Sequence, residues 1–298
     1  GWLGRWHGDG IIARIETPQI ARAVAATRLP AVDVSAGRHL PGIPWVETDD
    51  EAITHAALEH LSHRGFRHFG YCGEPRFNWS RWRRDCFDRE VARMGGQAYV
   101  YESAAKAGKP VPYYREHQRL VAWVRQLPKP VGVIACYDIK GQQLLDACRD
   151  ADIAVPEEVA VIGVDNDDLL CNLASPPLSS VIPNTRRTGY QAAALLARMM
   201  AGESLGEEAQ RIPPLGIATR QSTDTLAIDD PDVAAAVRFI REHACEGINV
   251  ADLLRALPLT RRDLEARFRK ILACTPHEEI VRVRIDRVTQ LLCETDLP

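Results

Sequence analysis

Short apolar runs alternate with longer amphipathic segments along most of the chain. The runs at 10–15, 30–35, 66–73, 131–138 and 159–166 are rich in β-branched or aromatic residues, which favour strands. The longer segments between them place apolar residues at helical spacing. This alternation predicts right-handed βαβ units built around parallel sheets. Two of the runs, VGVIAC and VAVIGV, are apolar without interruption, which is typical of strands covered by helices on both faces.

The predicted helices begin and end at recognisable capping residues. Thr17 precedes Pro18, a combination typical of a helix N-terminus, and Gly65 follows a helical segment where glycine commonly ends a helix. Further strands are predicted at 98–102 and 178–182. The helices of this part are predicted at 17–29, 50–65, 80–95, 114–127, 140–152 and 185–202.

The pattern changes after Thr223. Residues 222–232, STDTLAIDDPD, are polar and contain a proline, which indicates a linker. Every later segment has helical periodicity only. We therefore predict an α/β domain at 1–227 and an all-α domain at 228–298. The helices of the second domain are predicted at 233–244, 249–257, 261–272 and 277–295.

The composition is that of a soluble globular protein. Of 298 residues, 46% are hydrophobic and 26% are charged, and no apolar run approaches the roughly 20 residues that a membrane helix needs. The eight cysteines occur singly, without a CxxC pair, so neither a zinc site nor a disulfide framework is predicted. No signal peptide opens the chain. We expect a cytoplasmic protein without membrane contact, metal or cofactor.

Acidic residues follow three of the predicted strands. Glu74 follows FGYCG, Asp138 follows VIACY and Asp165 follows VIGV. In sheets of this kind, ligands bind outside the carboxyl ends of the strands, so these three side chains are candidate ligand contacts. Each also has an alternative role. Asp138 and Asp165 are suited to capping the helices that follow them, and Glu74 to opening a loop.

Positive charge is concentrated near the C-terminus, although the formal net charge is −3. In 261–272, Leu264, Phe268 and Leu272 form an apolar stripe, and basic residues cover most of the remainder. The tight turn LPLT joins this segment to the preceding one, 249–257. The arrangement predicts a helix-turn-helix, whose second helix enters the major groove of DNA. A solvated amphipathic helix is the alternative interpretation.

The face opposite the apolar stripe holds the candidate DNA contacts. Arginine can bond guanine bidentately and glutamate can accept from cytosine, each with roughly 1–3 kcal/mol of discrimination. Contacts to phosphate give affinity and salt dependence instead. The candidate base readers are Arg262, Glu265 and Ala266, the candidate phosphate contacts are Arg261, Arg269 and Lys270, and Thr260 is the predicted N-cap.

Residues 233–298 resemble the DNA-binding domain of the arabinose-regulator (AraC-type) family. Ile280 replaces the family's aromatic residue, Val288 replaces its alanine, and Ala266 stands where many members carry a polar reader. The resemblance implies one helix-turn-helix and a linker helix, and the family's second helix-turn-helix is expected to be missing. The residues that match are LEARF (264–268), Pro276, Ile280, Arg284, Val288 and Leu291–Leu292.

Residues 133–196 are similar to the sugar-sensing domain of the lac/galactose-repressor type. The pieces VPEEVAVIGVDN, PPLSSVI and GYQAAALL carry the similarity. It implies a two-lobed, periplasmic-binding-protein-like fold of type I in which Asp165 bonds sugar hydroxyls. The family's R-x-x-G-F arginine falls on Arg83, and its strand-end asparagine is replaced by Tyr137, next to the retained acid Asp138.

The chemistry of a sugar agrees with these residue types. Carboxylates and a guanidinium pair with hydroxyls through charge-assisted hydrogen bonds, and flat aromatic rings cover the apolar face of the sugar. Trp79 and Trp82 flank Arg83, although tryptophan on a helix is more often a core residue. The candidate sugar-binding residues are Asp165, Arg83, Asp138, Tyr137, Trp82 and Trp79.

A sensing domain followed by an AraC-type domain resembles the xylose-operon regulator family. The resemblance runs from Asp9 to Leu292. It implies a homodimeric transcription activator that senses D-xylose or a related pentose and binds operator or promoter DNA. It also implies that a strand and a helix precede Gly1. Two alternatives stay open: a sugar-binding protein without a transcriptional role, and an enzyme of doubly wound fold. No GxGxxG, P-loop or GxSxG motif is present, and we expect no enzymatic activity.

Overall fold

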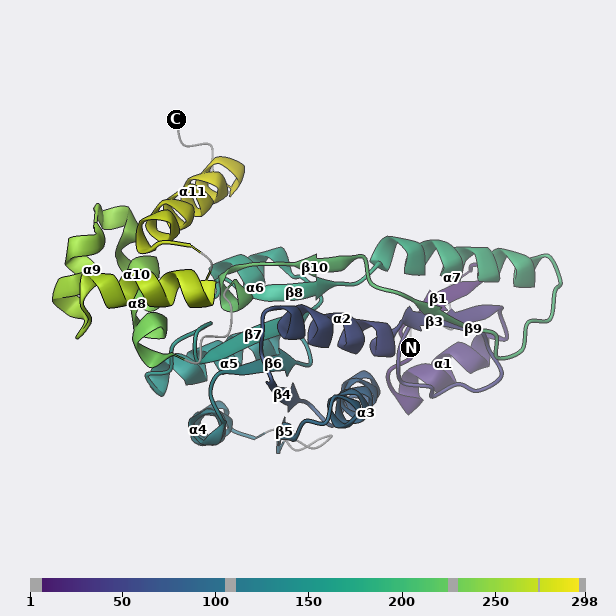
Figure 1. The fold of residues 1–298 in the computed structure, drawn as a ribbon. Coiled ribbons are helices and arrows are strands. Elements are labelled where there is room, and N and C mark those ends of the chain that lie inside the picture. The colour runs from purple at the N-terminus through teal and green to yellow at the C-terminus, as the bar shows by residue number, and fades with distance from the viewer. Residues whose placement is uncertain (1–6, 105–110, 225–229, 273, 295–298) are drawn as a thin grey trace. The chain divides into compact units, whose positions relative to one another are not determined.

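The computed structural model describes residues 7–104, 111–224, 230–272 and 274–294 (Figure 1). The chain divides into two compact units, Gly1–Asp224 and Thr225–Pro298. Residues 225–229 of the predicted linker and the predicted helix end at residue 295 lie outside the described residues. Within the described ranges, no helix has the length and apolar character required to cross a membrane.

The first lobe of unit 1 is a four-stranded parallel sheet with the order β1-β2-β3-β9. Successive residues of a strand point to opposite faces, so Ala31 packs with the residues of α1 and Val32 packs with those of α7. Thr17 caps α1 as predicted, accepting from Ile20 N at 3.2 Å. The elements are β1 (Ile11–Ala13), β2 (Ala31–Asp33), β3 (Trp45–Thr48), β9 (Ala209–Ile212), α1 (Pro18–Thr27) and α7 (Thr185–Met200).

The second lobe is a six-stranded sheet with the order β10-β8-β7-β6-β4-β5, parallel except for the antiparallel edge strand β10. Every residue of β6 and β7 is buried, as their unbroken apolar runs predict. The strands are β4 (His68–Gly73), β5 (Ala98–Glu102), β6 (Val131–Ala135), β7 (Val159–Val164), β8 (Ser179–Ile182) and β10 (Gly216–Ala218), and the helices are α2 (Asp50–His63), α3 (Asn78–Arg93), α4 (Tyr113–Gln126), α5 (Asp138–Asp150) and α6 (Asp168–Leu173).

The backbone passes between the two lobes at three places in the described part of unit 1: from β3 to α2, from β8 to α7 and from β9 to β10 (Figure 1). The carboxyl end of β3 therefore points toward the second lobe, and that of β8 points toward the first. Because the strands around them run parallel, the carboxyl ends of both sheets face the space between the lobes. This is where ligands of parallel sheets bind.

The predicted start of the linker, at residue 222, is wrong. Residues Gln221–Thr223 form a 3₁₀ helix, η2, in which Ser222 and Thr223 are both fully buried. Ser222 Oγ donates to the Val161 carbonyl at 2.6 Å, and Thr223 Oγ1 donates to Ser179 Oγ at 2.7 Å. The polar composition suggested exposure, but a hydroxyl that is hydrogen-bonded can be buried at small cost.

The end of η2 is fastened to α2 by two side chains. His60 Nε2 lies 2.8 Å from Thr223 Oγ1, and Arg64 Nε donates to the Thr223 carbonyl at 2.7 Å. Burial lowers the pKa of His60 to about 4, and the charges of Arg64 and His63 contribute in the same direction. His60 therefore stays neutral in the folded protein at mildly acidic pH.

We expect His60→Gln to reduce the acid sensitivity of the protein. The folded-state pKa of about 4 lies below the ordinary value of 6.5, so the unfolded chain binds more protons. The contribution of this residue to stability is therefore lost as the pH falls from about 6.5 to 4, by up to about 3 kcal/mol. Urea unfolding at pH 7 and pH 4.5 measures the difference. His63→Gln, at a side chain 73% exposed on the same helix, is the control and should match the wild type. The same pH dependence in both variants would contradict the prediction.

Unit 2 is helical throughout its regular elements in the described residues. Leu253, Leu264, Phe268 and Ile280 come from three helices and share one core with the buried face of α8. Arg284 ties α11 to the residues between α8 and α9, donating at 2.7 Å to the carbonyls of Ala244 and Ile248. The elements are α8 (Pro231–His243), η3 (Ala244–Glu246), α9 (Val250–Ala256), α10 (Arg261–Leu272) and α11 (Pro276–Glu294).

Candidate functional site

A buried ion pair lies where the chain crosses between the lobes. Arg83 on α3 donates from Nε to Oδ1 of Asp50, the first residue of α2, at 2.7 Å. Its Nη1 donates to the Cys136 carbonyl at 2.5 Å. Burial raises the pKa of Asp50, although Arg83 acts against this rise. These bonds use two of the five N–H groups of the guanidinium, so donors remain for a ligand.

Asp165 follows β7 in a backbone conformation that few residues adopt. Its φ is 113°, and that of Asn166 is 50°, so two consecutive non-glycine residues have positive φ. Such strain costs about 1–3 kcal/mol per residue and is found most often at functional sites. Burial raises the pKa of Asp165 to about 6, against the attraction of Arg83. The residue as a whole is nevertheless exposed to solvent, so a ligand can reach it.

Asp138 lies beneath this turn and is nearly inaccessible, at 1% exposure. Its Oδ1 accepts from Ser180 Oγ at 2.6 Å, and its Oδ2 accepts from Asp167 N at 2.8 Å. The same Ser180 Oγ accepts from Asn166 N at 3.0 Å. Both carboxylate oxygens are thus used by the protein, and the arrangement supports the turn that carries Asp165.

Aromatic rings gather around the ion pair. The Trp79 ring lies in edge contact with Tyr137 at 5.5 Å between centroids, and the Arg83 guanidinium lies 4.9 Å from the Trp79 ring. Phe77 stacks on Trp79 with 4.8 Å between the ring centroids. Trp79 and Tyr137 are half-buried, and Trp82 is 37% exposed. Rings that are partly open in this way can cover the apolar face of a ligand.

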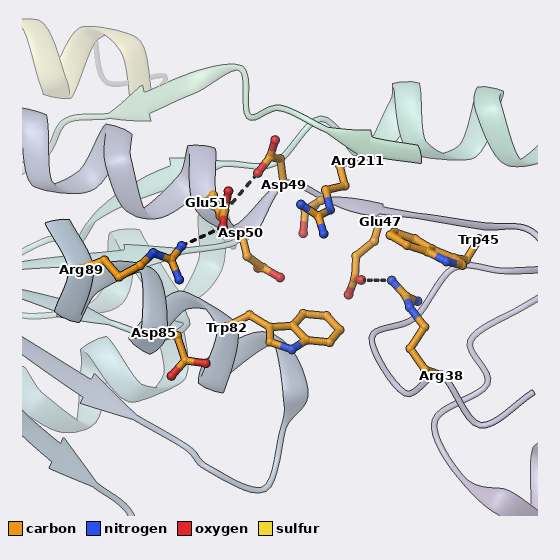
Figure 2. Close-up of a pocket in the computed structure, with 11 residues that line it drawn as sticks. Arg38, Trp45, Glu47, Asp49, Asp50, Glu51, Trp82, Asp85, Arg89 and Arg211 are labelled. Atoms are coloured by element: carbon orange, nitrogen blue, oxygen red, sulfur yellow. Dashed lines mark hydrogen bonds and ion pairs between the residues drawn. The ribbon is translucent and has the colours of Figure 1, made fainter. Parts of the chain in front are cut away.

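A cavity of about 330 Å³ opens beside Asp50. Figure 2 shows the carboxylates of Asp50 and Glu47 and the ring of Trp82 directed toward the same space. Its volume is within the range of small-molecule sites. The lining residues come from both lobes and from the crossover between them: Arg38, Trp45, Glu47, Thr48, Asp49, Asp50, Glu51, Trp82, Asp85, Arg89 and Arg211.

Glu47 is, like Asp50, an acid of this cavity with a raised pKa. Burial and the neighbouring Asp50 raise the pKa of Glu47 to about 7, although Arg38 opposes the rise. Arg38 Nη2 bonds Glu47 Oε2 at 2.6 Å, and its guanidinium lies 3.5 Å from the Trp45 ring. The first lobe therefore contributes a carboxyl group, a guanidinium cation and an aromatic ring to the cavity.

Sequence reasoning missed Arg38, Trp45, Glu47 and Asp50. The strand β3 was not predicted, because Trp45–Thr48 is short and leads directly into a helix. The rule that identified Asp165, an acid after the carboxyl end of a strand, would also have selected the run ETDD had β3 been recognised. Arg38 lies in a loop and carries no such signal.

Glu74 belongs to a separate buried cluster. Its Oε2 lies 3.4 Å from Lys140 Nζ, and the same ammonium lies 3.6 Å from Glu116 Oε1. Lys140 is 2% exposed. The cluster ties the carboxyl end of β4 to α4 and α5, and so has a structural role beside the cleft.

The candidate DNA contacts lie on the outer side of α10. Leu264 and Phe268 are buried on the inner side, whereas Thr260, Arg261, Arg262, Ala266, Arg269 and Lys270 are exposed and Glu265 is half-buried. Arg261 pairs with Glu265 at 3.0 Å. Thr260 Oγ1 accepts from Asp263 N at 3.2 Å, the hydrogen bond expected of an N-cap.

Residues 58–223 match the family of the periplasmic binding protein-like domain. The xylose operon regulatory protein of Escherichia coli (strain K12) is 35% identical over 299 residues, covering 98% of this chain and 76% of the relative. The protein of the same name from Haemophilus influenzae is 35% identical over 296 residues, with 97% and 76% covered.

A solved structure of a xylose-binding transcription activator superposes on this chain with a TM-score of 0.83 and 34% identity, covering 97% of this chain and 77% of that one. A dimeric lac repressor superposes with a TM-score of 0.59 at 19% identity, covering 74% and 79%, and shares the fold alone. The periplasmic-binding-protein-like α/β fold that the sequence predicts is confirmed for unit 1.

Proposed function

The chain belongs to the family of xylose operon regulatory proteins, and from this premise we propose that it binds D-xylose, or a related pentose, between the lobes of unit 1. It is accordingly a regulator and not an enzyme. The observation that carries the proposal is the grouping of Arg83, Asp50 and the strained turn at Asp165 beside partly open aromatic rings. Neutral polyols are recognised by such a set of charged acceptors, donors and flat apolar surfaces.

Each residue has a distinct role in this proposal. The Asp165 carboxylate accepts hydrogen bonds from sugar hydroxyls, and the spare N–H groups of Arg83 donate to them. Trp79, Tyr137 and Trp82 cover the apolar face of the ring. Asp138 acts one step away, by holding the backbone of the turn. A ligand touching both lobes stabilises the closed arrangement and shifts the population toward it.

The two lobes of unit 1 also contact each other directly. Asn78 Nδ2, at the start of α3, donates to the Ala36 carbonyl of the first lobe at 2.8 Å. Asp165 in the second lobe is also within electrostatic range of Arg14, which follows β1 in the first. A sugar that changes these contacts would change the arrangement of the lobes, and this change could couple sugar binding to regulation.

A tryptophan fluorescence titration tests the sugar proposal. Trp79 and Trp82 lie on α3, and Trp45 lines the cavity, so binding should change the emission. We expect a saturable response to D-xylose and a weaker one, or none, to L-arabinose, D-ribose and D-glucose. Isothermal calorimetry on the same samples guards against a binding event that leaves fluorescence unchanged. Absence of binding of D-xylose, L-arabinose and D-ribose by both methods would refute the proposal.

We further propose that α9 and α10 form an AraC-type helix-turn-helix that binds operator or promoter DNA, in a homodimeric activator. The second helix would present Arg262, Glu265 and Ala266 to base edges, with Arg261, Arg269 and Lys270 on phosphates and Thr260 at the N-terminus of the helix. The exposure of these residues opposite the buried stripe supports this orientation. When Glu265 accepts a hydrogen bond from a base, its ion pair with Arg261 would weaken or break.

In a protein that carries both helix-turn-helix units of the AraC-type family, Arg262→Ala should weaken binding to a selected DNA site more than binding to a scrambled duplex. A bidentate contact to guanine contributes about 1–3 kcal/mol of discrimination, whereas a phosphate contact contributes equally to every sequence. Fluorescence anisotropy with a duplex selected from random DNA by the protein, and with its scrambled version, measures both affinities. Arg269→Ala is the control and should lower the two equally. Equal losses for Arg262→Ala would make Arg262 a phosphate contact.

A further inference from the structure

The turn at Asp165–Asn166 is held from two sides. On the side of the sheet, Ser180 Oγ accepts from Asn166 N, and Asp138 accepts from Asp167 N and from Ser180 Oγ. On the other side lies Arg220, which belongs to the segment between β10 and η2. Its Nη1 donates to Asn166 Oδ1 at 2.9 Å. The residue next to the proposed sugar contact is therefore bonded to a segment 54 positions later in the chain.

Arg220 makes a set of bonds that fixes its position. Nε donates to Asn172 Oδ1 at 2.8 Å, Nη1 also donates to the Leu178 carbonyl at 3.1 Å, and Nη2 lies 3.4 Å from Asp168 Oδ1. Its side chain is 16% exposed. A planar guanidinium with several directed donors specifies one arrangement of its acceptors, which an ammonium would not do. The arrangement of residues 166–172 and the position of Arg220 are thus interdependent.

The segment that begins at Arg220 leads out of unit 1. Ser179 Oγ accepts from Arg220 N at 2.8 Å and donates to the Arg220 carbonyl at 2.9 Å. Ser222 and Thr223 are buried directly after it, and Thr223 is bonded to His60 on α2 and to Arg64, the C-cap residue of α2. Unit 1 ends at Asp224, so this segment is the last part of the sensing unit before unit 2.

We propose that Arg220 is a positioning residue that couples the ligand-facing turn at Asp165–Asn166 to the segment 220–224, through which unit 1 connects to unit 2. The proposal rests on the proposed function, in which Asp165 contacts the sugar. A sugar bonded to Asp165 selects one conformation of a strained turn. That conformation places Asn166 Oδ1 where Arg220 can bond it, and a bonded Arg220 stabilises segment 220–224. Because coupling between two sites is reciprocal, order in the segment also favours the ligand-competent turn.

Hydrogen exchange of the full chain tests the coupling with and without saturating D-xylose. In the wild type, we expect the sugar to slow exchange at the amides of Ser222 and Thr223 by about fivefold or more, the factor for a coupling of about 1 kcal/mol. In Arg220→Gln this slowing should be lost. Arg198→Gln removes another arginine that is paired with carboxylates, on α7, and should leave the slowing intact.

Substitution of the acceptor gives a second, independent pair of variants. Asn166→Gly removes the side chain that Arg220 bonds and tolerates the positive φ, whereas Asn166→Asp keeps an oxygen in that place. We expect Asn166→Gly to behave like Arg220→Gln, and Asn166→Asp to retain the xylose-dependent slowing. This pair also decides the question if Arg220→Gln does not fold. Persistence of the slowing in both Arg220→Gln and Asn166→Gly would overturn the proposal.

The measurements without sugar separate failure of the coupling from failure of the proposed function. Asn166 N and Asp167 N are both hydrogen-bonded, so their exchange reports on the turn. Arg220→Gln should accelerate exchange there, and Asn166→Gly should accelerate it at Ser222 and Thr223. If both accelerations occur but the wild type does not bind D-xylose, the link stands and the proposed ligand is wrong. If neither occurs, the coupling is refuted whatever the sugar result.

Discussion

Asp165→Asn lowers the affinity for D-xylose by about 10- to 150-fold while the protein stays folded. Hydrogen bonds to a charged group are worth about 1.5–3 kcal/mol, and each 1.4 kcal/mol is a factor of ten in affinity. Asparagine has nearly the same shape as aspartate and is among the residues that best tolerate positive φ, so the turn at φ 113° is preserved. The substitution therefore removes charge with little change of structure.

Isothermal calorimetry with D-xylose at pH 7.5 gives the affinity, and circular dichroism confirms the fold. Asp167→Asn is the matched control, because the same change is made two positions along the chain. Asp167 caps α6 through its side chain, a role that asparagine also performs. Its affinity should lie within about threefold of the wild type, as expected for a surface change. An unchanged affinity in Asp165→Asn would remove Asp165 from the site.

The pH dependence provides a check on the same carboxylate. Burial raises the pKa of Asp165 to about 6, so this group takes up a proton as the pH falls through 6. The neutral acid is a weaker acceptor than the carboxylate. Wild-type affinity for D-xylose should therefore decline from pH 7.5 to pH 5, and the Asp165→Asn variant should lack this part of the decline.

Arg83→Met should destabilise unit 1 by about 3–5 kcal/mol, the usual cost of leaving one partner of a buried ion pair alone. The variant leaves Asp50, only 6% exposed, without the cation that neutralises its charge. It also removes the donor to the Cys136 carbonyl and the cation beside Trp79. Methionine retains much of the length and apolar volume of the arginine stem, so the loss is mainly electrostatic.

Urea unfolding monitored by circular dichroism measures the free energy of unfolding. Arg84→Met is the control on the same helix. Arg84 is paired with Glu102 at 2.5 Å, but its side chain is 37% exposed, so water screens the pair and the loss should be under about 1 kcal/mol. The double variant Asp50→Asn, Arg83→Met should recover part of the loss, because no unpaired charge remains. Similar losses of unfolding free energy for Arg83→Met and Arg84→Met would show that the buried Arg83–Asp50 pair stabilises the protein no more than the exposed Arg84–Glu102 pair does.

The sequence by itself determined the α/β class of unit 1 and the helical nature of unit 2. Both follow from local patterns, namely unbroken apolar runs such as 159–164 and helical stripes such as Leu264 and Phe268. The position of Asp165 after β7 also followed locally, since strand ends can be read along the chain. The assignment of Arg83 came from a family motif, not from periodicity.

Only the tertiary structure decided which partners these residues have. Arg83 meets Asp50 across 33 positions and Arg220 meets Asn166 across 54, and no local pattern encodes such pairs. The same holds for Asp138, whose carboxylate oxygens accept hydrogen bonds from Ser180 and Asp167. Sheet register and the crossovers between lobes bring these groups together. Local propensity acts over a few residues, whereas the satisfaction of buried charges and hydroxyls depends on the whole packed unit.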